Sequence, residues 1–141
     1  MNLFLDTSAL LKLYDNEIGS DEMELLFTTN KIEKIYLSSL TILELESAIR
    51  KKQRMKLLTE SETEEISRLF TEDSSKFTWI EIDDKILQRA FLLLKKYGIE
   101  GLRTLDAIQL SSAIEVKNDV ALNITYDKLL KSLFEKEDLN N

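Results

Sequence analysis

The chain has 141 residues and contains no histidine, cysteine or proline. This length suits one domain, and the missing residue types exclude disulfides, cysteine-based zinc sites and imidazole chemistry. Its 19 basic and 26 acidic residues give a net charge of -7, which repels nucleic acid overall, so RNA or DNA binding would need a local basic patch or metal ions.

Short apolar segments alternate with helical patterns along the whole chain. Strands are predicted at residues 3–6, 35–38, 77–82 and 120–125. Helices are predicted at residues 8–14, 21–28, 40–53, 60–71, 85–97, 105–117 and from 127 to about 136. The alternation predicts a single α/β domain over residues 1–141, in which helices flank a central, mostly parallel sheet. Only residues 135–141 look like a frayed tail.

Capping residues support several of these helices. Thr59 with Glu62 three residues later predicts a capping box, and Ser20 is the expected N-cap of the helix over 21–28. Asp83 is placed to cap the helix after the third strand, and Gly98 to end that helix.

No segment of the sequence resembles a membrane anchor. The longest apolar run, residues 90–94, is far shorter than the roughly 20 residues that span a bilayer. The N-terminus enters the first strand directly, with no basic segment of the kind that opens a signal peptide. We therefore expect a cytoplasmic protein.

Two acidic residues follow predicted strands. Asp6 closes the first strand and Asp127 comes directly after the fourth. Because ligands of open parallel sheets bind beyond the carboxyl ends of the strands, we expect both carboxylates at the same edge of the sheet.

Two further acids, Glu44 and Asp106, lie in otherwise apolar helical stretches. No cation stands three or four residues from Glu44, and a buried carboxylate without a basic partner is costly unless a cation satisfies it. A set of oxygen ligands alone favours hard ions such as Mg²⁺ or Mn²⁺. Glu46 competes with Glu44, and helical periodicity does not separate the two.

Helix capping is the alternative explanation for these acids. An Asp after a strand is often an N-cap, which would account for Asp127, and an acid in the first turn complements the helix dipole, which would account for Asp106. Capping explains Asp6 less well, because Thr7 or Ser8 would serve equally.

These acids stand in motifs that resemble a known family. Residues 3–14 (LFLDTSALLKLY) closely resemble the opening of PIN-domain proteins, especially VapC-type toxins of bacteria and archaea. Residues 38–50 are similar to the second motif of that family, whose acid precedes a small residue by four positions and a basic residue by six. This spacing selects Glu44, which stands before Ala48 and Arg50.

The two remaining motifs follow in order. Residues 105–113 (LDAIQLSSA) resemble the third motif and residues 124–130 (ITYDKLL) the fourth. The four motifs occur in order and are distributed along nearly the whole chain, and the ordered set is much more specific than any one of them. Many relatives continue into a fifth strand, for which residues 133–138 offer no clear pattern, so the resemblance implies four or five strands.

The resemblance implies a metal-dependent endoribonuclease. Asp6, Glu44, Asp106 and Asp127 would be the catalytic residues and would hold Mg²⁺ or Mn²⁺. Three further side chains would position water or substrate, namely Ser8, Thr125 and Arg50. Similarity to VapC-type toxins also implies a cognate antitoxin and a homodimer.

Other functions stay open at this point. One is a PIN-fold module that binds RNA or protein without cleaving, which the retention of all four acids disfavours. Another is a PIN nuclease of RNA processing or repair. A haloacid-dehalogenase-type phosphatase would need a second Asp at the position of Ser8. The basic run over residues 50–56 either grips RNA or forms a solvated helix end, and the second interpretation is favoured.

Overall fold

The structure is a computed structural model that describes residues 1–141. Its centre is a sheet of four parallel strands in the order β3-β2-β1-β4. The strands are β1 (Asn2–Leu5), β2 (Lys34–Ser38), β3 (Thr78–Ile80) and β4 (Leu122–Ile124). The α-helices are α1 (Thr7–Leu11), α2 (Ser20–Thr29), α3 (Leu40–Arg54), α4 (Glu60–Asp73), α5 (Asp84–Tyr97), α6 (Thr104–Glu115) and α7 (Lys128–Lys136). The predicted α/β fold with a parallel sheet is confirmed.

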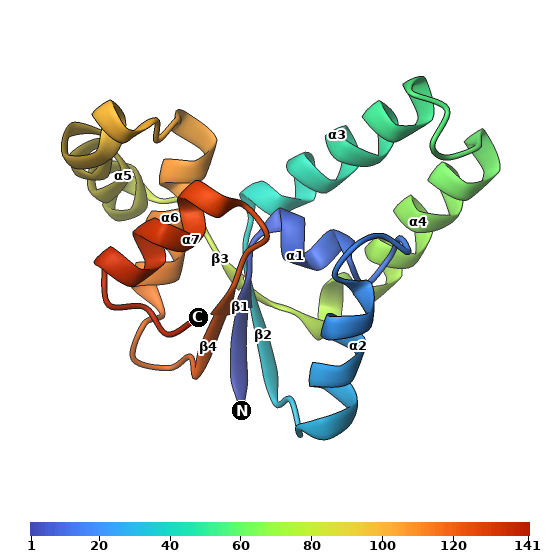
Figure 1. The fold of residues 1–141 in the computed structure, drawn as a ribbon, viewed down its shortest axis with the longest axis horizontal. Helices are drawn as coiled ribbons and strands as arrows, with labels where there is room; N and C mark the ends of the chain where they lie inside the picture. Colours follow the sequence, from blue (N-terminus) through green and yellow to red (C-terminus); the bar gives the residue numbers. More distant parts are fainter.

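The helices form two layers, one on each face of the sheet. Figure 1 shows α1 to α4 on one side of the strands and α5 to α7 on the other. In β1, Leu3 and Leu5 join the core under α1 to α4, whereas Phe4 joins the core under α5 to α7. Successive side chains of a strand point to opposite faces, and both faces are covered here, which is why β1 is a continuous apolar run.

All predicted strands and helices are present, and the differences lie at their ends. The first helix was expected to reach Tyr14, but α1 ends at Leu11. Beyond it, Leu13 donates its backbone N–H to Leu10 and Tyr14 donates to Leu11. These bonds span three residues rather than four, so the chain tightens into turns that apolar periodicity does not distinguish from a helix. The third strand is also shorter, over Thr78–Ile80 rather than 77–82.

The capping predictions have mixed outcomes. The capping box of Thr59 and Glu62 is present, and the side chain of Asp83 accepts a hydrogen bond from the first turn of α5. Ser20 is not the N-cap of α2. That position belongs to Gly19, whose φ of 102° lies in the left-handed region that glycine tolerates. The Ser20 hydroxyl instead bonds the backbone of the preceding loop.

Gly98 ends α5 as expected, although its backbone stays right-handed helical and the chain continues into the short 3-10 helix η2 (Gly98–Glu100). The left-handed turn comes three residues later, at Gly101, with a φ of 107°.

The C-terminal segment packs against the sheet, so the prediction of a frayed tail over 135–141 is wrong. Leu139 is buried, and the carbonyl of Asn140 accepts a hydrogen bond of 2.7 Å from the backbone N–H of Asn123 in β4. The segment forms no fifth strand, and β4 is one of the two edge strands of the sheet. None of the helices combines the length and the apolar character that crossing a bilayer demands.

Candidate active site

The four acids selected from the sequence meet in one pocket of about 330 Å³ at the carboxyl edge of the sheet. This acidic pocket is lined by Asp6, Thr7, Ser8, Leu11, Glu44, Ala48, Asp106, Gln109 and Asp127. They come from the ends of β1 and β4 and from three helices, so residues far apart in the sequence converge beside the central strands, where ligands of parallel sheets bind.

Asp6 is the most buried of the four, with 4% of its surface exposed. Its Oδ1 accepts hydrogen bonds from the backbone N–H of Ala9 at 2.9 Å and from the Ser8 hydroxyl at 2.7 Å, and its Oδ2 accepts from the Thr125 hydroxyl. Asp6 is therefore the N-cap of α1, a role that the sequence assigned as readily to Thr7 or Ser8. The pKa of Asp6 is raised to about 6, because burial and the charge of Glu44 raise it by more than the three hydrogen bonds lower it.

Ser8 and Thr125 hold Asp6 from two different elements. The Ser8 hydroxyl donates to Asp6 and accepts from the backbone N–H of Tyr126 at 2.9 Å. The Thr125 hydroxyl also donates to Asp6 and accepts from the backbone N–H of Asp127 at 3.1 Å. Both hydroxyls therefore connect the end of β1 to the end of β4 and orient the Asp6 carboxylate.

Glu44 is held by a hydrogen-bond network that the sequence analysis did not identify. Its Oε1 accepts from the Thr7 hydroxyl at 2.8 Å and from the amide Nε2 of Gln109 at 2.7 Å. The same amide lies 3.0 Å from the Thr41 hydroxyl. Gln109 is only 2% exposed, and its Oε1 has no hydrogen-bond partner. Its one sequence signal is its position three residues after Asp106, which puts both side chains on the same side of α6.

Glu46 points elsewhere. Its carboxylate accepts two hydrogen bonds from Arg50, at 2.9 and 2.7 Å, and a third from the Ser67 hydroxyl of α4 at 2.9 Å. The structure thus places Glu44, and not Glu46, in the acidic pocket, in agreement with the choice made from the motif spacing.

Asp106 and Asp127 complete the pocket. Asp106 lies in the first turn of α6. Burial raises its pKa, and the charges of Asp127 and Glu44 raise it further, whereas the charge of Arg103 lowers it. Asp127 is exposed and caps α7, accepting a hydrogen bond of 2.7 Å from the backbone N–H of Leu130. The capping interpretation of Asp127 is therefore correct, and it is compatible with a place in the pocket.

The donor set fits a hard divalent cation. None of the four carboxylates takes part in a salt bridge, and the raised pKa values of Asp6 and Asp106 reflect burial and mutual repulsion that a cation would relieve. As the side chains stand, no three of them converge tightly enough to enclose an ion. Mg²⁺ does not require this, because it keeps several waters and binds through one or two carboxylates.

Two residues of the basic run over residues 50–56 form ion pairs. Arg50 bonds Glu46 and, at 2.7 Å, Glu64, and it does not line the acidic pocket. Lys52 pairs with Asp15 and Glu17 in the loop between α1 and α2. A substrate contact by Arg50 stays a prediction.

Arg103, which the sequence analysis did not single out, lies nearer the acids. It lines a neighbouring pocket of about 610 Å³ together with Glu44 and Asp106 and forms no salt bridge.

Comparison with known proteins agrees with this architecture. A family model described as the PIN domain matches residues 3–133. Among solved structures, the chain is similar to VapC20 of Mycobacterium tuberculosis, described as a sarcin–ricin loop cleaving toxin, with a TM-score of 0.70, 11% identity and coverage of 93% of this chain and 94% of that one.

Two complexes are also similar. A toxin–antitoxin complex from Klebsiella pneumoniae matches with a TM-score of 0.63, 20% identity and coverage of 89% and 86%. VapBC2 of Rickettsia felis, bound to a DNA fragment from its promoter, matches with a TM-score of 0.64, 18% identity and coverage of 94% and 92%. No curated protein matches the sequence.

Proposed function

Because the chain belongs to the PIN domain family, we propose that it is a metal-dependent endoribonuclease and the toxin of a toxin–antitoxin pair. The observation that carries the proposal is the acidic pocket, in which four carboxylates from separate elements face one space without any ion-pair partner. Like charges repel, so the grouping of these carboxylates works against stability, even though Asp6 and Asp127 also cap helices. A site that holds a cation and acts on a phosphodiester accounts for it.

The chain's own residues would prepare this site in three ways. Asp6, Glu44, Asp106 and Asp127 would hold Mg²⁺ or Mn²⁺, which acidifies water and neutralises charge on phosphate. Ser8 and Thr125 keep the Asp6 carboxylate oriented, and Thr7 and Gln109 do the same for Glu44. Because these supports are uncharged, they fix the carboxylates without neutralising them.

RNA must approach a protein of net charge -7. Arg103 is the best-placed cation for this purpose, because it lies beside Glu44 and Asp106 and is free of ion pairs. A guanidinium there would bind a phosphate next to the one that reacts. Arg50 is the weaker candidate, because its guanidinium already bonds Glu46 and Glu64.

The proposed partners follow from the toxin assignment. A cognate antitoxin would block the site, and a basic side chain on it would complement the acidic pocket. We also propose a cytoplasmic homodimer. Leu87, Phe91 and Leu92 form an exposed apolar surface on α5, and contiguous apolar surface of this kind favours a protein contact.

The decisive experiment is incubation of the purified protein with total RNA, with and without Mg²⁺ or Mn²⁺. We expect cleavage only with the metal, and none by the Asp6→Asn variant. If the protein binds RNA but does not cleave it in the presence of either metal ion, it is instead a non-catalytic module. Cleavage combined with the absence of a neighbouring gene for a small protein with an arginine-rich C-terminus would indicate a nuclease of RNA processing or repair.

A further inference from the structure

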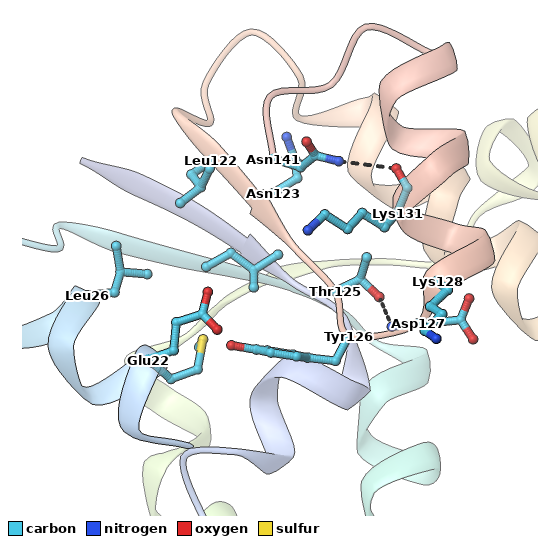
Figure 2. Close-up of a pocket in the computed structure, with 12 residues that line it drawn as sticks. Glu22, Leu26, Leu122, Asn123, Thr125, Tyr126, Asp127, Lys128, Lys131 and Asn141 are labelled. Carbon is cyan, nitrogen blue, oxygen red and sulfur yellow. Dashed lines mark hydrogen bonds between the residues drawn. The ribbon is translucent and has the colours of Figure 1, made fainter. Parts of the chain in front are cut away.

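A second pocket, of about 340 Å³, lies beside the acidic pocket and between α2, β4 and α7 (Figure 2). We call it the β4 pocket. Asp127 lines both pockets, so the two sites adjoin. The volume falls at the lower end of the roughly 300–1,000 Å³ range of small-molecule sites, which suits one nucleotide better than a larger ligand. Its apolar lining comes from Met23, Leu26, Leu122 and Ile124.

The ring of Tyr126 provides a flat wall of this pocket. Figure 2 shows the ring almost edge-on along one side of the space, with Lys131 on the opposite side. The ring is held in place from behind: the ammonium group of Lys12 lies 4.9 Å from its centroid, and a Cβ added at Gly19 would come within 2.7 Å of its Cε1. A fixed aromatic face open to a pocket is the usual platform on which single-stranded nucleic acid stacks a base.

The charges of the β4 pocket are asymmetric. Lys128 and Lys131 line it on the side of α7 and form no ion pair, whereas Glu22 lines it on the side of α2. Phosphates would therefore lie along α7, next to Asp127, and the uncharged base would point towards α2.

We propose that the β4 pocket binds one nucleobase of single-stranded RNA, adjacent to the phosphate at the acidic pocket. The base stacks on Tyr126, and Lys128 and Lys131 hold its backbone phosphates. This inference rests on the proposed ribonuclease function and adds a base-binding subsite to it.

The test measures binding of short, fluorescein-labelled single-stranded RNA by anisotropy, in an Asp6→Asn background that prevents cleavage. We expect Tyr126→Leu to weaken binding by roughly 5- to 150-fold, the fold-change that corresponds to loss of one stacked base. Tyr126→Phe keeps the ring and should bind like the parent. Lys131→Gln should also weaken binding. Lys34→Gln is the control: it removes the same charge at the first residue of β2, away from the carboxyl edge of the sheet, and should not weaken binding.

An abasic nucleotide identifies the base that occupies the pocket. At one position of the RNA, an abasic nucleotide should weaken binding to the parent protein, which keeps Tyr126. With that abasic RNA, the Tyr126→Leu variant should bind no more weakly than the parent does. Thermal unfolding of each variant excludes misfolding as the cause. If Tyr126→Leu and Lys131→Gln are folded and bind RNA like the parent, the subsite is refuted, even where the wild type cleaves RNA. If the wild type neither binds nor cleaves RNA, the proposed function fails as well.

Discussion

Glu44 and Glu46 are two positions apart in the sequence, which corresponds to about 200° around the axis of α3, and this places them in different environments. Glu44 faces the acidic pocket, whereas Glu46 bonds Arg50 and Ser67. We expect Glu44→Gln to lower RNA cleavage by about 100-fold, the effect of losing one electrostatic group from an active site. Glu46→Gln should leave cleavage near the wild-type rate. An initial-rate assay at saturating metal compares the two, and an inactive Glu46→Gln enzyme would show that the second motif is misaligned.

Gln109 bonds Glu44, and we expect it to position that carboxylate rather than to bind substrate. Its Nε2 donates to the Glu44 carboxylate, while its buried Oε1 has no partner. We expect Gln109→Leu to weaken Mn²⁺ binding by about 10-fold, as loss of a hydrogen bond to a metal ligand does. The free energy of unfolding without metal should not fall, because the change also removes an unsatisfied buried oxygen.

Calorimetric Mn²⁺ titration and thermal unfolding measure these two effects. Gln53→Leu near the C-terminal end of α3, which does not line the acidic pocket, is the matched control. Unchanged Mn²⁺ affinity in Gln109→Leu would argue against the positioning role.

The acids of the site were accessible from the sequence because each lies in a local motif with a fixed spacing. Their supports were accessible only in part. The motifs drew attention to Ser8 and Thr125 as groups that position water or substrate, but not to the bond that Thr125 forms with Asp6 across 119 positions of the chain. Gln109, which bonds Glu44 across 65 positions, was not identified. Such long-range contacts leave no local pattern, since a glutamine or threonine beside apolar residues is common in any helix or strand end.

At the scale of the elements, α3 is joined to the loop after α1 through Lys52. Its ammonium pairs with Asp15 and Glu17, and all three side chains are less than a quarter exposed. Burial raises the pKa of Glu17, but hydrogen bonds from Lys12 and Lys52 outweigh it and hold the value below 4.5. These pairs therefore stabilise the fold above that pH, and the stabilisation is lost as the pH falls through the pKa of folded Glu17.

We expect Lys52→Met to lower the free energy of unfolding by about 1 kcal/mol near neutral pH, the upper end for partly exposed pairs. The difference from the wild type should shrink as the pH falls below 4.5, the ordinary pKa of the Glu17 carboxyl. Lys51→Met, at an exposed neighbour without an ion pair, should have little effect at any pH. Denaturant unfolding at several pH values measures this, and a pH-independent loss in Lys52→Met would assign the effect to packing.

The order and type of the elements followed from the sequence, whereas several of their ends did not. Apolar periodicity carries through the turns after Leu11, because bonds that span three residues keep almost the same side-chain pattern as a helix. The packing of Leu139 was missed for a related reason, since one apolar residue in a charged, asparagine-rich tail gives no period.

On the scale of the whole molecule, a net charge of -7 makes the position of unpaired cations decisive for RNA binding. Arg103 lies beside the acids without an ion pair, while Arg50 is bonded to Glu46 and Glu64. In the Asp6→Asn background, Arg103→Gln should reduce the slope of log affinity against log salt by about 0.7, the value for one phosphate contact with a single strand. Arg50→Gln should change the slope less. Anisotropy at several salt concentrations measures both, and a larger change for Arg50→Gln would reverse the assignment.

The central strand β1 separates the two hydrophobic cores, with Leu3 and Leu5 in one and Phe4 in the other. If β1 slipped by one residue relative to β2 and β4, each of these side chains would turn to the wrong layer. Asp6 follows directly on this strand, so the same slip would carry its carboxylate away from Thr125. A molecule that misaligns β1 therefore loses its core and its acidic pocket together. The position of Asp6 is consequently coupled to the register of the core, and a long-lived population with intact packing but a slipped β1 is not expected.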